Sequence, residues 1–251
     1  MILARITRAL KDQNWFAVAL EFIIVIAGVV IGFQVTAWND GRSERVIIAG
    51  QLREVREDIR ADLIALEETR QASLWRMRAA EYLLLSIENE GELRRIPAVP
   101  WGDGLDRSIL PVVSEADHSS LLARVNLIRG VTGRSTGYDS LVNSGNIRLI
   151  ETDALRTTIQ RYYAGYEDFE SNLSIFRDIR AAAIPILYRH GFSLFSEQDL
   201  ASVIEAAEND PAFIAYLRTG RELGLGQIGG VLEREAEARA LLALVDAELA
   251  P

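Results

Sequence analysis

The sequence predicts an all-α protein, with an N-terminal transmembrane helix followed by a helical bundle with long antiparallel helices. Residues 15–38 form one apolar run, and most of the remaining chain repeats apolar residues at spacings of three and four. No stretch alternates apolar and polar residues as a half-buried strand does. The 251 residues accommodate one span and a soluble region of about 200 residues, which is long enough to bury a core.

Composition narrows the function classes. The net charge is −9, and an acidic chain repels phosphate backbones, so we expect no nucleic-acid partner. The chain has no cysteine, which excludes a disulfide scaffold, zinc–thiolate sites and thiol nucleophiles. Hydrophobic residues make up 49% and charged residues 25%, as in ordinary folded proteins.

Residues 15–38 have the length and composition of a membrane span. Glu21 is the only ionisable residue between Asp12 and Asp40. A helix over this run is about 36 Å long at 1.5 Å per residue, which exceeds the ~30 Å hydrocarbon core. Trp15 and Trp38 lie at its two ends, where indole rings anchor at the membrane interfaces. Residues 1–14 are then a short cytoplasmic tail.

A cleaved signal peptide is the competing interpretation, with residues 35–37 (Val-Thr-Ala) as the cleavage site. The apolar run is longer than the usual 7–15 residues of such a peptide, which favours a span. Basic residues flank the run almost evenly, with Arg5, Arg8 and Lys11 before it and Arg42, Arg45, Arg53 and Arg56 after it. Because long domains translocate regardless of charge, we expect a cytoplasmic amino terminus and a periplasmic main domain.

Four residues of the span are predicted to form a membrane-helix interface: Glu21, Gly28, Gly32 and Gln34. Gly28 and Gly32 form a G-x-x-x-G pair, which allows two helix backbones to approach closely. Glu21 lies about two turns from Trp15, so its carboxylate either reaches the membrane–water interface or faces another helix. Gln34 lies about 140° round the helix from Glu21, so the two do not share one narrow stripe.

Beyond the span, residues 43–90 predict one long amphipathic helix, with a break from the span at Asp40-Gly41. Charges alternate within it, and the acidic residues Glu54, Glu57 and Asp58 are interpreted as part of a solvated face. Residues 91–251 form the remainder of the soluble domain. Prolines and glycines make residues 91–113 a loop.

Shorter helices follow. Residues 114–129 predict a helix capped by Ser114, with Asp117 as its capping-box partner. Residues 138–143 predict a short helix that ends at Gly145, and a long helix is expected from residue 151 or 152 to about 188, bent at Pro185. A further helix over 197–208 is assigned Ser196 as its cap.

The C-terminal region predicts two helices separated by glycines. Pro211 begins the first, and the glycines between residues 220 and 230 are expected to loosen the chain. The last helix repeats apolar residues at heptad spacing, with Glu235 in the remaining seam position, as in a coiled coil. Its seam residues are Val231, Ala238, Leu242, Val245 and Leu249. We expect this helix to pack on the first long helix.

Two stretches together resemble a known family. One is the span with Glu21, Gly28, Gly32 and Gln34, followed by Trp38-Asn39 and a long charged helix. The other contains Tyr138-Asp139-Ser140-Leu141, Ser144-Gly145-Asn146, Leu149-Ile150, Leu155-Arg156 and Tyr162-Tyr163. This order is similar to the membrane-anchored domain of unknown function 6090 family, an uncharacterised bacterial family. The resemblance implies a single-pass membrane protein with a helical domain and no assigned activity.

Candidate chemistry is sparse. Asp117-His118-Ser119 contains the residue types of a hydrolase triad, but neighbours on one helix point in different directions. His190 follows a predicted helix, and a cationic side chain is favourable near a helix C-terminus, so we interpret His190 as structural. The G-x-G-x-x-G stretch at residues 224–229 follows no predicted strand, which argues against dinucleotide binding. We therefore predict no catalytic residue, no metal site and no cofactor.

One surface remains a candidate for a ligand or partner: Ser144, Gly145, Asn146, Tyr162, Tyr163 and Tyr166. Tyrosines at helical spacing also suit a buried core, so both interpretations stand. The sequence thus favours a non-enzymatic, membrane-anchored adaptor, assembly factor or accessory subunit of the bacterial inner membrane. Its partners would be the membrane and a second copy or another membrane protein, met through helices. The alternative is an envelope sensor or small-ligand-binding module with its site near the tyrosines.

Overall fold

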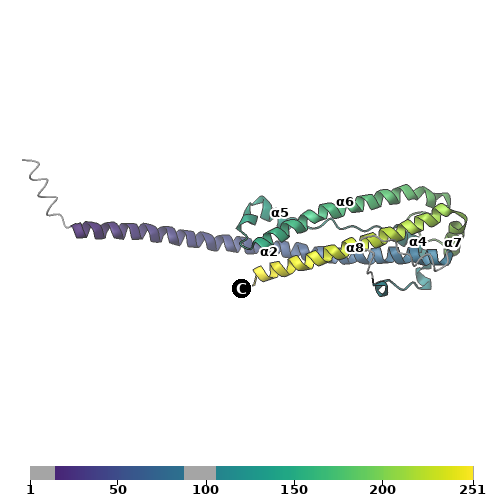
Figure 1. The fold of residues 1–251 in the computed structure, drawn as a ribbon, viewed down its shortest axis with the longest axis horizontal. Helices are drawn as coiled ribbons and strands as arrows, with labels where there is room; N and C mark the ends of the chain where they lie inside the picture. The colour runs from purple at the N-terminus through teal and green to yellow at the C-terminus, as the bar shows by residue number, and fades with distance from the viewer. Residues whose placement is uncertain (1–14, 88–105, 251) are drawn as a thin grey trace, which may run out of the picture. The chain divides into compact units, whose positions relative to one another are not determined.

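The computed structural model describes residues 15–87 and 106–250, without the side chains of residues 15–18 and 107. The described residues contain no strand, and the all-α prediction is confirmed. The α-helices are α2 (Trp15–Ile87), α4 (Leu121–Asn126), α5 (Thr136–Asn143), α6 (Asp153–Arg189), α7 (Leu200–Asn209) and α8 (Pro211–Glu248) (Figure 1). The chain divides into two units at residue 50, and each is described by itself.

The first unit contains the start of α2. Helix α2 is uninterrupted through Asp40 and Gly41, so the predicted break there is wrong. A single glycine in a helix interior costs only about 1 kcal/mol, which the surrounding helical hydrogen bonds outweigh. The Arg45 Nε atom also donates a hydrogen bond to the Gly41 carbonyl at 3.1 Å. The expected cytoplasmic tail, residues 1–14, lies outside the described residues.

The second unit is built on three long helices: α2 from residue 51, α6 and α8 (Figure 1). Ion pairs Arg56–Asp246 and Arg70–Glu235 show that α8 runs antiparallel to α2, since residue numbers rise on one helix as they fall on the other. Helix α6 runs parallel to α2 and antiparallel to α8 (Figure 1). The expected antiparallel packing of the last helix on the first is confirmed by these pairs.

An extended connection, residues 127–135, makes the parallel pairing of α2 and α6 possible because it returns the chain along α2. The carboxylate of Asp62 accepts a hydrogen bond from the Arg134 backbone N–H at 2.8 Å, and Asp58 accepts from the Gly137 N–H at 2.6 Å. Arg76 donates to the Leu127 carbonyl. Buried backbone groups outside secondary structure need such partners. Asp58 is therefore buried, and its assignment to a solvated face was wrong.

Helix α8 crosses the glycine-rich stretch without interruption, so the predicted two helices are one. Its glycines allow close packing instead of loosening the chain. A Cβ atom added to Gly224 would lie 3.0 Å from the backbone nitrogen of Met77 on α2. A Cβ on Gly220 would lie 2.6 Å from the side chain of Val125. Tertiary contact thus offsets the low helix propensity of glycine.

The C-terminal half of α8 follows its heptad pattern in part. Val231, Ala238, Val245 and Glu235 are buried, whereas Leu242 is only half-buried and Leu241 beside it is buried. Glu235 is held by an ion pair with Arg70 at 3.1 Å, which explains a carboxylate in the apolar seam.

The shorter elements match the predictions at some boundaries and not at others. Asp117 accepts hydrogen bonds from the Ser114 N–H and hydroxyl, but the helix expected at 114–129 is a 3₁₀ turn over Glu115–Ser120 followed by α4. Helix α7 begins at Leu200, capped by Asp199 and not by Ser196, because the Asp199 carboxylate accepts from the Ser202 N–H at 3.0 Å. Gly145 ends the α5 turn with φ of 72°, as expected.

Two other predicted boundaries concern the end of α2 and the start of α6. Helix α2 is described as far as Ile87, so its predicted end at residue 90 and residues 91–105 of the expected loop lie outside the described residues. Helix α6 begins at Asp153, with Thr152 as its N-cap residue, and contains Pro185.

Candidate functional site

A buried tyrosine–carboxylate cluster joins α2, α6 and α8. The Tyr162 hydroxyl donates a hydrogen bond to the Asp62 Oδ2 atom at 2.9 Å and lies 3.1 Å from the Tyr166 hydroxyl. The Arg234 guanidinium covers the rings of Tyr162 and Tyr166, with centroids 4.8 and 4.5 Å away. It also donates to the Tyr162 carbonyl at 2.6 Å. The cluster therefore already holds one cation against tyrosine rings.

Burial controls the ionisation of this cluster. It raises the pKa of the Asp62 carboxyl above its usual range, although hydrogen bonds from Arg134 and Tyr162 oppose the shift. Burial also raises the pKa of Tyr162 and of Tyr166, so both hydroxyls stay protonated at neutral pH. Neither is suited to act as a base. These groups position the connection between α2 and α6.

Tyr163 lies apart from that hydrogen-bonded cluster. Its ring stacks on Tyr138 of α5, with centroids 4.3 Å apart and planes 13° apart. Its side chain is 9% exposed, and its hydroxyl is buried without a hydrogen-bond partner among the described residues. An unpaired buried hydroxyl carries an energetic cost.

An open depression of about 370 Å³ lies beside these rings, between α6 and the segment that leads into α5. Its aromatic wall is formed by Tyr138, Tyr163 and Tyr166. Its carboxylates come from Asp139, Glu167 and Glu170, and all three residues are exposed. Both kinds of side chain therefore border one space.

The other predicted residues of this surface are held elsewhere. The Gln51 side chain donates from Nε2 to the Ser144 hydroxyl at 3.1 Å, and its Oε1 accepts from Asn146 at 3.0 Å. Gly145 lies between them with open space around its Cα. This loop shares no hydrogen-bond partner with the tyrosines, so the structure separates the predicted surface into two places.

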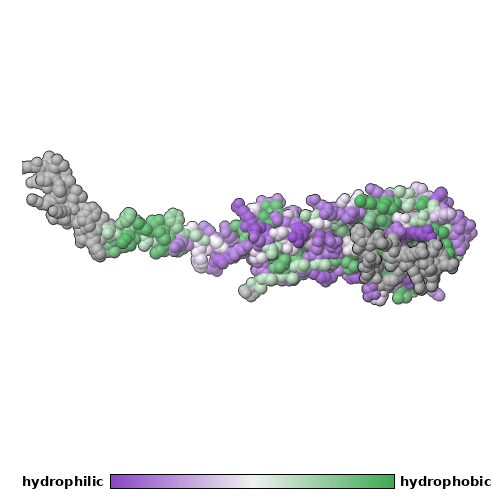
Figure 2. Space-filling model, in the orientation of Figure 1, coloured by the Kyte–Doolittle hydropathy of each residue, from purple (hydrophilic) through white to green (hydrophobic). Residues whose placement is uncertain are grey.

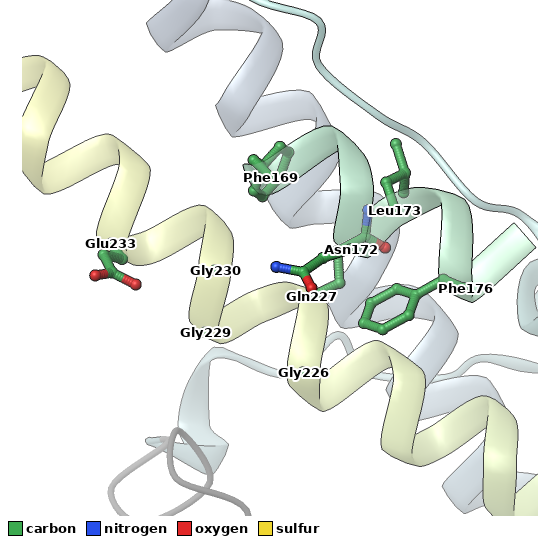
Figure 3. Close-up of a pocket in the computed structure, with 9 residues that line it drawn as sticks. All are labelled: Phe169, Asn172, Leu173, Phe176, Gly226, Gln227, Gly229, Gly230 and Glu233. Atoms are coloured by element: carbon green, nitrogen blue, oxygen red, sulfur yellow. The ribbon is translucent and has the colours of Figure 1, made fainter. Parts of the chain in front are cut away.

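A second hollow of about 190 Å³ lies between α6 and α8 (Figure 3). Phe169 and Phe176 of α6 line it, and the bare backbone of α8 at its glycines completes the surface (Figure 3). Gln227 also lines it, but both ends of its amide are engaged, by Arg76 and by the Arg129 carbonyl. The sequence signal was the glycine spacing at residues 226, 229 and 230, which places small residues on one helix face.

The predicted membrane-helix residues all lie on the first part of α2. Glu21, Gly28, Gly32, Gln34 and Trp38 are exposed, and a Cβ atom added to Gly28 or Gly32 would meet nothing within 4 Å. Trp15 begins the helix. Large apolar side chains cover the face in view in Figure 2, and Phe33 is 73% exposed. Within the described residues, one helix is long and apolar enough to cross a membrane, by length and composition.

The histidines have structural partners. The His118 Nε2 atom lies 2.9 Å from the Tyr82 hydroxyl, and Asp117 pairs with Arg124 at 3.1 Å, so Asp117 and His118 face different partners. His190 lies 3.0 Å from Asp210, the N-cap residue of α8. No three His, Asp or Glu side chains in residues 15–87 and 106–250 are grouped to hold a metal ion. The G-x-G-x-x-G stretch lies inside α8.

Comparison of the chain with protein-family models, with curated proteins and with solved structures returned no match. The resemblance to the domain of unknown function 6090 family stays a prediction.

Proposed function

We propose that this protein is a membrane-anchored helical interaction protein of the bacterial inner membrane, serving as an adaptor, assembly factor or accessory subunit without catalysis of its own. The observation that carries the proposal is the unburied apolar surface of the first part of α2. Its exposed large apolar residues are Leu20, Phe22, Ile23, Ile24, Val25, Ile26, Val29, Val30, Ile31, Phe33 and Val35. Soluble proteins rarely leave such a contiguous surface in water.

The free-energy balance favours insertion of this part of α2. Each Leu, Ile, Phe or Val contributes roughly −0.3 to −0.6 kcal/mol at a helix centre, so the exposed set contributes about −3 to −7 kcal/mol. An acidic residue at the centre costs about 3 kcal/mol. Glu21 lies near the end of the apolar run, where the cost is smaller. Insertion therefore tolerates this one carboxylate.

The helical face with Gly28 and Gly32 would meet a second copy or a partner membrane helix. Glycines four residues apart leave a shallow groove in which backbones pack closely. In native membranes, a Gly28→Leu, Gly32→Leu double variant is expected to lose crosslinked species, because leucine side chains separate the backbones. Gly41→Leu is the matched control, since a Cβ there also meets nothing within 4 Å. Unchanged crosslinking in the double variant removes this interface.

Membrane attachment has its own test. Alkaline extraction of membranes is expected to leave the full chain in the pellet. A variant lacking residues 19–37 should appear in the soluble fraction with its circular dichroism still helical. Recovery of the intact chain in the supernatant would contradict the anchor.

A second function, binding of a small ligand beside the tyrosines, is favoured by one specific observation. The depression has an aromatic wall of Tyr138, Tyr163 and Tyr166, and such walls are typical of small-ligand sites. Ligand-dependent thermal stabilisation that Tyr163→Ala abolishes would support it. Stabilisation that persists in this variant would place the ligand elsewhere.

A further inference from the structure

We propose that a small cavity among α2, α4, α6 and α8 binds one monovalent anion of halide size, with chloride as its occupant. The cavity has a volume of about 20 Å³, and both Arg76 of α2 and Arg180 of α6 line it. Two guanidinium groups therefore share one space that contains no counter-charge. This anion site is independent of the membrane anchor and of the depression beside the tyrosines.

The two arginines have only neutral partners. Arg76 is 1% exposed, and it donates to the Gln227 amide oxygen at 2.6 Å and to the Leu127 carbonyl. Arg180 donates to the Asn126 carbonyl at 3.1 Å. Among the described residues, no aspartate or glutamate borders the cavity. Buried charges are ordinarily paired with an opposite charge, so this arrangement lacks an anion.

The positive charges of the two arginines also repel each other. Burial and the charge of Arg180 lower the pKa of the Arg76 guanidinium to about 10, and no described carboxylate opposes this shift. Arg76 still carries its charge at neutral pH, so loss of a proton does not relieve the repulsion. A bound anion reverses the sign of the interaction for both arginines at once.

Unpaired donors are a second, independent sign of an anion. The Nε atoms of Arg76 and Arg180 are both enclosed without a hydrogen-bond partner in the part of the chain that the structure describes. The other polar side chains at the cavity have engaged donors. The Tyr216 hydroxyl donates to the Asn126 Oδ1 atom at 2.5 Å. The Asn126 amide and the Thr219 hydroxyl each donate at 3.0 Å to a carbonyl one turn earlier in their own helices. Guanidinium N–H groups thus remain, and these suit an anion.

The size of the cavity selects a small ion. A volume of about 20 Å³ exceeds the roughly 10–15 Å³ that one water-sized body needs. A chloride ion is only slightly larger than water, whereas sulfate and phosphate carry several oxygens. A water molecule also fits the space but supplies no negative charge. Val125, Ile179 and Leu223 also line the cavity, and apolar walls strengthen the attraction between an anion and the guanidinium groups.

Thermal unfolding of the full chain in nonionic detergent micelles tests the proposal, with chloride as the probe and circular dichroism as the readout. Sodium gluconate keeps the ionic strength constant as sodium chloride is raised, because gluconate is too large for the cavity. A ligand that binds only the folded state stabilises it in proportion to ln(1 + [L]/Kd), so the unfolding temperature should rise with chloride. Bromide should act as chloride does. An unfolding temperature that does not change with chloride would mean that water fills the cavity, and would overturn the proposal.

Variants on α6 locate the site. Arg180→Gln removes one charge but keeps an N–H donor, so the chloride concentration needed for equal stabilisation should rise by about tenfold or more. Arg177→Gln is the matched control, since Arg177 is exposed and does not line the cavity. This control should change that concentration by no more than about twofold. Equal losses in both variants would indicate only general attraction of chloride to positive side chains, and would overturn the site.

Chloride nuclear magnetic resonance keeps the proposal testable if Arg180→Gln does not fold. The folded parent chain should broaden the chloride resonance, and excess bromide should reverse the broadening by displacing the bound ion. Arg180→Lys keeps the positive charge and should still broaden the resonance. No broadening by the folded parent chain, or broadening that bromide leaves unchanged, contradicts a chloride site.

Discussion

The two parts of α2 have opposite surfaces. In the first part, large apolar side chains are exposed and Phe22 is 66% exposed. From residue 51 onward, four charged side chains of α2 are buried, those of Asp58, Asp62, Arg76 and Glu81, and Arg76 is 1% exposed. One helix thus passes from apolar residues outside to charged residues inside. The first part is therefore suited to a non-aqueous surrounding. The second part is a folded interior, and it tolerates charge because each buried charge has a partner.

Three buried charges of the second part share a single task. Asp58, Asp62 and Arg76 all bond to backbone groups in or next to the connection between α4 and α5. Burial lowers the pKa of the Arg76 guanidinium to about 10, which still leaves it charged at neutral pH. These residues hold an irregular segment against three helices, a role that apolar side chains cannot fill.

The largest expected effect contrasts two helical glycines. A Cβ atom at Gly137 would lie 2.4 Å from the Val55 backbone nitrogen, and backbone atoms cannot move aside cheaply. Gly137→Leu should destabilise the bundle by about 3 kcal/mol or more in urea unfolding. Gly28→Leu, where a Cβ meets nothing within 4 Å, should leave the unfolding midpoint unchanged. Equal effects of the two substitutions on unfolding would contradict the claim that Gly137 is closely packed and Gly28 is not.

Removal of a buried carboxylate should have the next largest effect. Asp62→Ala leaves the Arg134 N–H and the Tyr162 hydroxyl without their acceptor, at a cost of about 2 kcal/mol. Asp168→Ala, at an exposed position on α6, should stay within about 0.5 kcal/mol of the parent protein. Chemical unfolding of both variants measures the difference. A loss of stability at Asp168 as large as that at Asp62 would contradict the claim that the hydrogen bonds of the buried Asp62 stabilise the bundle.

The same carboxylate predicts a pH dependence. Burial raises the folded-state pKa of Asp62 above its unfolded value of about 3.9, so the folded state binds the proton more tightly. The contribution of Asp62 to stability is therefore fully present below about pH 3.9 and is lost as pH rises through the raised pKa. Asp62→Asn cannot titrate. The stability of the parent minus that of Asp62→Asn should fall with rising pH, and a rise would contradict the burial effect.

The smallest expected effects separate backbone conformation from packing. Gly50 in α2 and Gly145 after α5 both have open space at their Cα atoms, but only Gly145 has a positive φ, of 72°. Gly50→Ala should stabilise by about 0.5 to 1 kcal/mol, because alanine favours the helix. Gly145→Ala should destabilise by about 1 to 2 kcal/mol, because a Cβ is strained there. Thermal unfolding of the two variants measures the sign of each stability change. The same sign in both variants would mean that the positive φ of Gly145 is not the cause.

Much of the fold was predictable because it depends on local patterns. The apolar run, the spacing along α2 and α6, the Ser114–Asp117 contact and the turn at Gly145 each follow from residues close together in the sequence. The errors arose where distant residues decide. Asp58 was predicted to lie on a solvated face, although its spacing from Val55 and Ile59 places it on the buried side of α2.

The candidate site was only partly predictable for the same reason. Tyr162, Tyr163 and Tyr166 were identified from their spacing, but nothing local indicates that Tyr138 stacks on Tyr163 or that Glu167 and Glu170 border the same space. The glycines of α8 were interpreted by propensity, and their contact with Met77 becomes visible only in the packed bundle.

Two reporters, each fused to the carboxyl terminus, test whether the first part of α2 spans the inner membrane. Alkaline phosphatase is active only outside the cytoplasm. Green fluorescent protein fluoresces when it stays in the cytoplasm and is dark when it is exported in unfolded form. If the first part of α2 spans the inner membrane with a cytoplasmic amino terminus, the phosphatase fusion is active and the fluorescent fusion is dark. A bright fluorescent fusion with an inactive phosphatase would contradict the account, because the helical bundle would then lie in the cytoplasm.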